Sequence, residues 1–553
     1  MNHRLHAVLL LALCGVLYLP GMATSPLYTR GEAREALAVR EVVHTGRWVV
    51  PMRPDGRLTR KPPLLYWTGM VAWRALPGMP EAAVRLPSVL AATLGVLAVA
   101  CLGRTAFGLA AGGAALVLAT SFEWMRSATS GRVDMLLSAA MTLVLLGWVA
   151  RLSGRGRGWT SALVVVGTAL AVLAKGPIGA AFPAAALVAT ALTTRDRTLL
   201  TLLVPLAGGA AAAALWYAIA YLEHGRAFLD IVLAENLGRF VDTTKAGTGH
   251  AHGPLFPVGM ALVGLLPWTP LLPLAAAPVQ VRPAVRTLLV AWIAVIVAVV
   301  TLSASKRSVY LLPAYPAVAL LLAAGVAAEP GARLARLLRV TTAAYAPVVA
   351  LVGAIVLAFA LGFDAATLLS GVLAPTDQAS LAAMQRVARQ QWLAMVLVAA
   401  ALVALAVLLA RRRREGDWAG MLPPVAAVMA VAALTFQIVL RPAIAQARGF
   451  AGFMPVVARL VPPGEPLYAY FPVEPSVRFY APRAVADWRT RPADRDVYFL
   501  AWEREVAALP AAARPALEQL AASEARYGRR GALVLLRVPR GVLPPRRAAA
   551  QKG

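Results

Sequence analysis

Long apolar runs separated by short polar breaks constrain the fold of this chain more than any other feature. About 20 apolar residues in a helix are needed to cross roughly 30 Å of hydrocarbon, and segments of about 17 to 25 residues qualify. The runs lie at residues 5–22, 86–103, 106–121, 134–150, 159–174, 177–193, 198–221, 255–276, 284–303, 308–327, 336–361, 391–410 and 418–440. We therefore predict a polytopic, all-α membrane domain with about thirteen transmembrane helices.

The first run has an alternative interpretation as a cleaved signal peptide. Arg4 precedes it, and small residues lie near Ala23, as at a cleavage site.

The composition agrees with a membrane protein. Of the 553 residues, 59% are hydrophobic and 14% are charged, which is far from the balance of a soluble domain. The formal net charge is +28, but the basic residues stand mostly in short loops between apolar runs, so we expect no nucleic-acid partner. Cys14 and Cys101 both lie within apolar runs, and we interpret them as small core residues rather than as a disulfide or a metal site.

Arginines in alternate loops predict the orientation of the helices. If the N-terminus is cytoplasmic, the loops on the same side carry most of the arginines, as the positive-inside rule requires. These arginines are Arg104, Arg151, Arg155, Arg157, Arg195, Arg197, Arg282, Arg286, Arg333, Arg336, Arg339 and Arg411 to Arg414. An odd number of spans then places the C-terminal segment on the opposite, outer side.

The C-terminal fifth of the chain differs in character from the rest. We predict a transmembrane domain over residues 1–445 and a small outer α/β domain over residues 446–553. Short apolar strands are expected at 467–471, 497–502 and 532–538, separated by helical stretches rich in alanine and arginine.

Two outer segments, residues 23–85 and 222–254, are long enough to carry structure of their own. Residues 31–43 (GEAREALAVREVV) have helical periodicity, so we expect a helix along the membrane surface. Pro62 and Pro63 suit the start of a second helix, which would place Lys61 beside a helix N-terminus that can face an anion. The alternative is that these two helices serve only packing.

Ionisable residues stand at or just inside the outer ends of several spans. Asp134, Lys175, Lys306 and Arg307 are costly there unless they are paired or face a water-filled cavity. Lysine and arginine side chains can extend along the helix so that the charged group reaches the membrane interface. This alone explains the position of Lys175, of Lys306 or of Arg307. The same explanation fits Asp134 poorly.

An ordered series of motifs then identifies a family resemblance. The motifs are GEAREALAVREVV, GRWVVPMRPDGRLTRKPPLLYW, RVDMLL, LAKGPIG, ENLGRFV, GHAHGP, LLPWTP and SASKRSVYLLPAYPAVALLLA. In order and spacing they resemble the polyprenyl-phosphate-dependent membrane glycosyltransferases of the C-type fold. That group contains the aminoarabinose transferases that modify lipid A and the protein O-mannosyltransferases. The resemblance implies a multi-pass protein of the bacterial inner membrane, with its cavity on the periplasmic side.

The resemblance also implies which residues bind the donor. Lys61 of the KPP motif and Arg239 of ENLGRF would hold the lipid phosphate, because a departing phosphate needs charge-assisted donors. Lys306, Arg307 and Tyr310 would extend this cationic pocket.

Three further residues of the matched motifs are assigned to substrate binding. They are Arg34, Tyr66 and Lys175.

The candidate catalytic groups depart from the family pattern. The family's first motif begins with Asp-Glu, whereas this chain has Gly31 and Glu32. We therefore predict that Glu32 takes the leading acid/base or acceptor-orienting role and that Asp134 is the second carboxylate. Some distant relatives carry a Gly-Glu-x-Arg-Glu version, which residues 31–35 resemble.

We predict neither a metal nor a cofactor. Aminoarabinose transferases can have an acid before Lys-Pro-Pro and a histidine before Arg-Phe, and here these positions are Arg60 and Ala234. His250 and His252 are spaced like ligands, but we interpret them as polar residues of a loop.

The resulting function is transfer of a sugar from undecaprenyl or another polyprenyl phosphate to lipid A or another cell-envelope acceptor. The sugar would be 4-amino-4-deoxy-L-arabinose or a related one, and family analogy implies inversion by direct displacement. The partners would be the sugar donor, the acceptor and membrane lipid. We expect the protein itself to be a monomer.

Three alternatives remain. One is a protein O-mannosyltransferase, and another is an oligosaccharide polymerase or ligase. The third is a flippase or transporter of lipid-linked saccharides, although no two-half repeat is evident in the sequence. The glycosyltransferase prediction requires the two acids and the phosphate-binding cations to share one aqueous pocket that opens to the periplasm.

Overall fold

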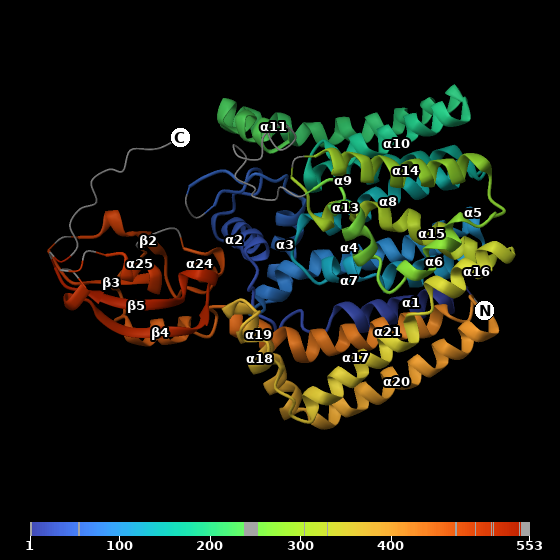
Figure 1. The fold of residues 1–553 in the computed structure, drawn as a ribbon. Coiled ribbons are helices and arrows are strands. Elements are labelled where there is room, and N and C mark those ends of the chain that lie inside the picture. The colour runs from blue at the N-terminus through green and yellow to red at the C-terminus, as the bar shows by residue number, and fades with distance from the viewer. Residues whose placement is uncertain are drawn as a thin grey trace. The chain divides into compact units, whose positions relative to one another are not determined.

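The computed structural model describes residues 3–53, 56–236, 253–303, 305–328, 330–469, 473–492, 494–509, 511, 514–540 and 542. Its chain divides into two compact units (Figure 1). The first comprises Met1–Met22, Ala38–Ile355 and Leu397–Thr435, and the second comprises Ala23–Leu37, Val356–Val396 and Phe436–Gly553. Three of the five boundaries fall within helices α2, α17 and α20, and the second unit contains more of the chain than its C-terminal segment.

The described part of the first unit is mainly helical, with one isolated β-bridge between Met52 and Leu58. Its α-helices, including the three that are divided between the units, are α1 (His3–Tyr18), α2 (Arg30–Thr45), α3 (Leu64–Ala75), α4 (Pro80–Leu102), α5 (Arg104–Phe107), α6 (Ala110–Ala119), α7 (Phe122–Ala128), α8 (Val133–Leu152), α9 (Arg157–Lys175), α10 (Ile178–Thr194), α11 (Leu203–Asn236), α13 (Phe256–Gly264), α14 (Pro283–Leu302), α15 (Tyr315–Ala327), α16 (Ala332–Thr341), α17 (Tyr345–Ala360), α20 (Trp392–Glu415) and α21 (Leu422–Thr435). Its 3-10 helices are η1 (Arg197–Leu202), η2 (Thr269–Ala276) and η3 (Ser308–Ala314).

The apolar helices coincide with the predicted runs. Within the described ranges, nine helices are long and apolar enough to cross a membrane, and a tenth span results if α13 and η2, which are bent by 100°, are counted together. Three shorter apolar helices, Leu5–Tyr18, Ala110–Ala119 and Ile178–Thr194, fall on the remaining predicted spans. The prediction of an all-α, multi-pass membrane fold is therefore confirmed, whereas the number of crossings is not fixed by length and composition.

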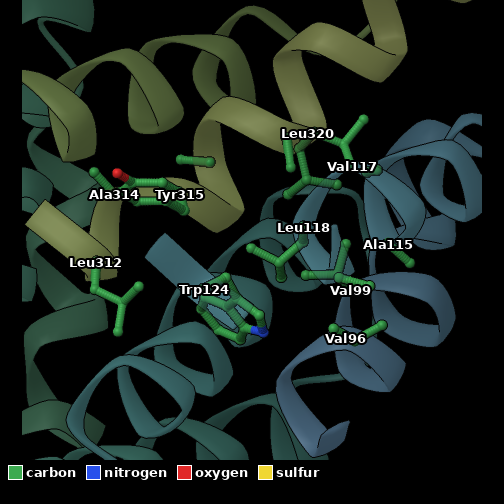
Figure 2. Packing of buried hydrophobic residues seen from close by; sticks show 14 of the residues in the cluster. Val96, Val99, Ala115, Val117, Leu118, Trp124, Leu312, Ala314, Tyr315 and Leu320 are labelled. Carbon is green, nitrogen blue, oxygen red and sulfur yellow. The ribbon is translucent and has the colours of Figure 1, made fainter. Parts of the chain in front are cut away.

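Small residues allow the helices of the first unit to pack closely. A methyl group added at Gly95 of α4 would lie 2.8 Å from the ring of Trp124 on α7, so glycine permits this contact. Figure 2 shows part of the resulting core, in which side chains of α4, α6 and α7 meet those of η3 and α15. The labelled residues are Val96, Val99, Ala115, Val117, Leu118, Trp124, Leu312, Ala314, Tyr315 and Leu320.

The second unit contains short helices and a five-stranded sheet. Its helical segments are α18 (Ala365–Leu368), α19 (Pro375–Gln390), the π-helical segment η4 (Phe436–Leu440), α22 (Arg441–Arg448), α23 (Met454–Leu460), α24 (Pro475–Tyr480), η5 (Trp488–Thr490), α25 (Glu503–Ala507), η6 (Arg514–Ala516) and η7 (Gly528–Arg530). The strands are β1 (Leu467–Ala469), β2 (Val485–Asp487), β3 (Val497–Trp502), β4 (Glu518–Arg526) and β5 (Ala532–Val538).

The sheet has the order β2-β1-β3-β5-β4. Strand β1 runs parallel to β2 and β3, whereas β5 runs antiparallel to β3 and β4. The three predicted strands correspond to β1, β3 and β5. The prediction of a helical stretch is wrong at Glu518–Arg526, because these residues pair with β5 as an edge strand.

Candidate active site

A cavity of about 550 Å³ lies in the first unit and combines polar with apolar walls. Its polar lining residues come from the segment before α3, the ends of α9 and α11, and the segment from α14 to η3. They are Lys61, Lys175, Glu235, Asn236, Ser303, Ser305 and Tyr310. Apolar side chains of α8, α10, α11 and α14, such as Leu137, Phe182 and Val299, complete the wall. A cavity of this kind suits an amphiphilic ligand.

Lys61 is followed by Pro62 and Pro63, and α3 begins at Leu64. Pro63 is the N-cap of α3, so the predicted helix start is confirmed. The Lys61 ammonium forms an ion pair with the Glu235 carboxylate, and the two side chains are only 13% and 7% exposed. Glu235 is the penultimate residue of α11, so this pair joins two segments that are far apart in sequence.

Lys175 is the last residue of α9, where a cation is favourable beside the helix C-terminus. The helix ends there because Gly176 has φ +92°, a conformation that side chains rarely adopt. A methyl group at Gly176 would also lie 3.0 Å from Oδ1 of Asn236. The Lys175 ammonium lies 2.5 Å from Oδ1 of Asp134 and 4.2 Å from the ring centre of Tyr310.

Asp134 lies in the first turn of α8 and is 3% exposed. Besides Lys175, it has Arg132 as a neighbour, whose Nε lies 3.4 Å from Oδ2. This arrangement explains how a carboxylate is accommodated within an apolar helix bundle, since buried charges require partners. Asp134 is not among the described residues that line the cavity, so it contacts Lys175 without lining the cavity itself.

The other residues predicted to bind the donor differ in burial, and one of them, Arg239, lies outside the described residues. Lys306 is buried and donates a hydrogen bond to the carbonyl oxygen of Ser303 at 2.7 Å. Arg307 is half-buried, and Tyr66 is buried on α3. Arg239, His250 and His252 lie outside the described residues. In the part of the chain that the structure describes, no three His, Cys, Asp or Glu side chains are grouped as metal ligands.

Glu32 and Arg34 belong to the second unit. The predicted helix over residues 31–43 is present as α2, and Glu32 on it is 1% exposed. The place of α2 along a membrane surface stays a prediction. Nη2 of Arg441 lies 4.0 Å from the Glu32 carboxylate, and Nη1 of the same arginine donates to Gln437 at 2.8 Å. Arg34 donates to Glu35 at 3.1 Å.

Sequence reasoning missed Glu235, Ser305 and Arg441. Glu235 and Arg441 each interrupt or end an apolar run, which is the same signal that drew attention to Asp134. Ser305 lines the cavity, and its buried hydroxyl has no hydrogen-bond partner among the described residues. A serine in a polar turn carries no distinctive sequence signal.

Comparisons with known proteins agree with this architecture. The family model of dolichyl-phosphate-mannose-protein mannosyltransferases matches residues 60–221. An undecaprenyl phosphate-alpha-4-amino-4-deoxy-L-arabinose arabinosyl transferase of Pectobacterium carotovorum subsp. carotovorum (strain PC1) is 27% identical over 357 residues, which cover 61% of this chain and 62% of that protein. A protein of the same name from Aeromonas salmonicida (strain A449) is 29% identical over 323 residues, covering 56% of this chain and 57% of its own. The chain thus spans about three fifths of the length of these relatives.

Among solved structures, ArnT from Cupriavidus metallidurans bound to undecaprenyl phosphate is similar over 97% of this chain and 99% of its own. The TM-score is 0.74 and the sequence identity is 21%. The C-type fold is therefore confirmed, and so is the resemblance to polyprenyl-phosphate-dependent glycosyltransferases that the motifs predicted.

Proposed function

We propose that this chain is a membrane glycosyltransferase that takes a sugar from a polyprenyl phosphate and transfers it to lipid A or another cell-envelope acceptor. The observation that carries the proposal is the cavity, which is lined by the cations Lys61 and Lys175 and by many apolar side chains. A polyprenyl-phosphate sugar has the matching parts, namely an anionic phosphate and an isoprenoid tail. The names of the relatives and the ligand of the similar structure are consistent with this donor.

The reaction needs a nucleophile and a stabilised leaving group. An acceptor oxygen attacks the anomeric carbon of the sugar and forms the new glycosidic bond. The bond from that carbon to the phosphate oxygen breaks, and the phosphate keeps the electron pair. Lys61 and Lys175 are suited to stabilise the developing phosphate charge, because charge-assisted donors act strongly in a site that excludes water.

A hydroxyl acceptor must also lose a proton during the attack, whereas an acceptor phosphate needs only to be positioned. We retain Glu32 as the candidate base or acceptor-orienting group, and Asp134 as the second carboxylate, which holds Lys175. The remaining predicted residues, Arg34, Tyr66, Arg239, Lys306, Arg307 and Tyr310, stay candidates for binding the donor.

We propose the same location and orientation as the sequence predicts. The arginine-rich loops favour a cytoplasmic N-terminus in a bacterial inner membrane, with residues 446–553 in the periplasm. Labelling of single introduced cysteines at Glu223 and Arg489, two exposed positions, tests this topology. Both positions should react from the periplasmic side, and protection of either one in intact cells would contradict the orientation.

Protein mannosylation is a second candidate function. It is favoured by the match of residues 60–221 to the mannosyltransferase family model. The donor class and the phosphate site would be the same, while the acceptor would be a protein hydroxyl group.

The decisive experiment is a transfer assay with purified protein in detergent. Radiolabelled polyprenyl-phosphate sugars are incubated with lipid A or with peptide acceptors, for wild type and for Lys61→Ala, Asp134→Ala and Glu32→Ala. Arg74→Ala is the matched control, because Arg74 is an exposed cation on α3 that does not line the cavity.

We expect label transfer to lipid A by wild type and the control, and loss of transfer in the three site variants. Transfer to peptide alone would favour the mannosyltransferase. Equal transfer by wild type and all variants would contradict the site assignment. Movement of the lipid across liposomes without sugar transfer would favour a flippase.

A further inference from the structure

Helix α16 carries arginines and exposed aliphatic side chains on the same face. Leu338 is completely buried and packs into the core of the first unit. Leu337 and Val340 are 48% and 68% exposed. Three arginines at intervals of three residues are exposed beside them, namely Arg333, Arg336 and Arg339. Aliphatic groups next to cations are typical of a helix at the boundary between acyl chains and lipid headgroups.

Hydrogen bonds from two residues hold the last turn of α16 in place. The hydroxyl of Thr341 donates to the carbonyl oxygen of Pro270 in η2 at 2.7 Å. Nε and Nη2 of Arg413 donate to the carbonyl oxygen of Arg339 at 3.1 and 2.9 Å. Figure 1 shows α16 and the C-terminal end of α20, which carries Arg413, at the same end of the helices. The arginines of α16 are therefore presented by an ordered surface.

The end of α20 adds a second group of cations. Together with those of α16 they form what we term the arginine cluster, which comprises Arg333, Arg336, Arg339 and Arg411 to Arg414. Two acids follow on the chain, and Glu415 lies 2.8 Å from Arg411 while Asp417 lies 2.7 Å from Arg412. Seven arginines and two acids leave an excess of positive charge, so the surface is complementary to anions.

The length of the helices places this cluster at the level of the lipid headgroups. Helices α16 and α17 together form a candidate span of 29 residues, Ala332–Ala360. At a rise of about 1.5 Å per residue this is about 43 Å, which exceeds the roughly 30 Å of hydrocarbon and matches the roughly 40–45 Å that includes the headgroups. The first turns of this span, which carry three of the arginines, therefore stand among the lipid phosphates.

An exposed apolar stripe continues from α16 along α17. It consists of Leu337, Val340, Val348 and Leu351, which are 48%, 68%, 52% and 59% exposed. Their spacings of three and eight residues are those of one helix face. Acyl chains can cover this stripe while the headgroup of the same lipid lies at the arginines.

We propose that the arginine cluster and the apolar stripe bind an anionic phospholipid of the surrounding leaflet. Its phosphate lies among the guanidinium groups, which donate charge-assisted hydrogen bonds, and its acyl chains lie along the stripe. A zwitterionic phospholipid binds more weakly, because its own cation stands next to the phosphate. The sequence predicts that this end of the helices is cytoplasmic, where arginines near the surface attract anionic lipids. The site shares no residue with the cavity of about 550 Å³, so the inference does not depend on the transfer reaction.

The test titrates the full chain in a nonionic detergent and counts bound lipids by native mass spectrometry. The ligands are phosphatidylglycerol, phosphatidylcholine with the same acyl chains, and glycerophosphoglycerol, which is the water-soluble headgroup of the first lipid. Two triple variants lose the same charge from exposed positions: Arg333→Gln with Arg336→Gln and Arg339→Gln on α16, and the matched control Arg155→Gln with Arg157→Gln and Arg197→Gln in other loops. A second pair tests the stripe, with Val340→Ser on α16 and Val204→Ser, at a 67% exposed position of α11, as its control.

We expect wild type and the control triple variant to bind phosphatidylglycerol about tenfold more tightly than phosphatidylcholine. In the α16 triple variant the two affinities should agree within about threefold. Val340→Ser should weaken phosphatidylglycerol binding about threefold, whereas Val204→Ser should leave it unchanged. Glycerophosphoglycerol at the same concentration should not displace the lipid, because it has no acyl chains. A melting curve of each variant confirms that it is folded.

Equal affinity of wild type for the two lipids, or an unchanged preference in the folded α16 triple variant, would overturn the inference. An equal loss of preference in the control triple variant would assign the effect to total charge and would contradict a local site. Displacement by glycerophosphoglycerol would show a site for soluble anions rather than for a membrane lipid. Equal binding by Val340→Ser and wild type would contradict the place of the acyl chains.

Discussion

Two glutamate–cation pairs in this protein have different surroundings. In the first unit, Lys61 and Glu235 face a cavity of about 550 Å³, and the lysine side chain is 13% exposed. In the second unit, Glu32 and Arg441 are 2% and 6% exposed, and Gln437 accepts a hydrogen bond from the arginine. A pair that faces a cavity can exchange partners with a ligand. In the second pair, Glu32 with Arg441, which we call the closed pair, the arginine contributes to stability and to the orientation of Glu32, the candidate base.

Substitutions at the two pairs should therefore affect different properties. Changes at the cavity should affect ligand binding and transfer first. Replacement of Arg441 in the closed pair should affect the free energy of unfolding first, whereas Glu32 keeps its proposed part in transfer. The following predictions test this distinction, beginning with the largest expected effect.

Replacing Lys61 by alanine should reduce kcat/KM for sugar transfer by about 100-fold or more, because the leaving phosphate loses a charge-assisted donor. The rate is measured with a labelled polyprenyl-phosphate sugar. Arg74→Ala, which removes an exposed cation from α3, should retain the wild-type rate. A Lys61→Ala rate close to that of wild type would show that this lysine does not contact the phosphate.

Replacing Asp134 by asparagine should reduce transfer by roughly 10- to 100-fold, because Lys175 loses the carboxylate that orients it toward the cavity. The effect should appear in both kcat and KM, since the phosphate is bound in the ground state and in the transition state. Asp230→Asn, at an exposed position of α11, serves as the control. If Asp134→Asn left both parameters unchanged, Lys175 would not depend on this partner.

Replacing Arg441 by methionine should lower the free energy of unfolding by about 3 kcal/mol, because a buried carboxylate loses a buried cation. Chemical unfolding of the full chain in detergent measures the change. The double variant Glu32→Gln with Arg441→Met should recover part of the lost free energy of unfolding, because the negative charge of Glu32 is then removed together with its cation. An unfolding curve of Arg441→Met that matches wild type would contradict the closed-pair interpretation.

The smallest expected effect concerns Glu505 on α25. Its side chain is 24% exposed, more than the glutamates of the two pairs compared above. Burial raises the pKa of Glu505 above its ordinary value of 4.5, although Arg530 lies 3.9 Å from the carboxylate and acts in the opposite direction. A raised pKa in the folded state means that stability is lost as the pH rises above the ordinary value. Glu505→Gln should therefore melt at a slightly higher temperature than wild type at pH 7.

At pH 4 the advantage of Glu505→Gln should vanish, because wild-type Glu505 is then largely protonated in the folded state. Glu524→Gln, at an exposed position of β4, should show no such dependence. An advantage that is the same at both pH values would assign the effect to packing rather than to charge.

The membrane fold could be predicted well because one property, the length of apolar runs, determines it. Each predicted run coincides with an apolar helix or with the bent pair of α13 and η2. The sheet was harder to predict. Residues 518–526 (EQLAASEAR) have good intrinsic helix propensity, but pairing with β5 overrides that local preference.

The site could be predicted in part. Motif order identified Lys61, Lys175, Tyr310 and Asp134. In the structure the first three line the cavity, and Asp134 contacts Lys175. Sequence alone could not find Glu235 as the partner of Lys61, because 174 positions separate the two residues. Arg441 was missed for the same reason, since its pairing with Glu32 depends on long-range contacts.

The central claim is that Lys61, at the polar part of the cavity, binds the phosphate of a polyprenyl lipid. The most direct measurement compares the affinities of polyprenyl phosphate and of the uncharged polyprenol for wild type and for Lys61→Ala. Wild type should prefer the phosphate by at least about tenfold, and most of this preference should disappear in the variant. Equal binding of both lipids by wild type, or a preference that survives in Lys61→Ala, would contradict the account.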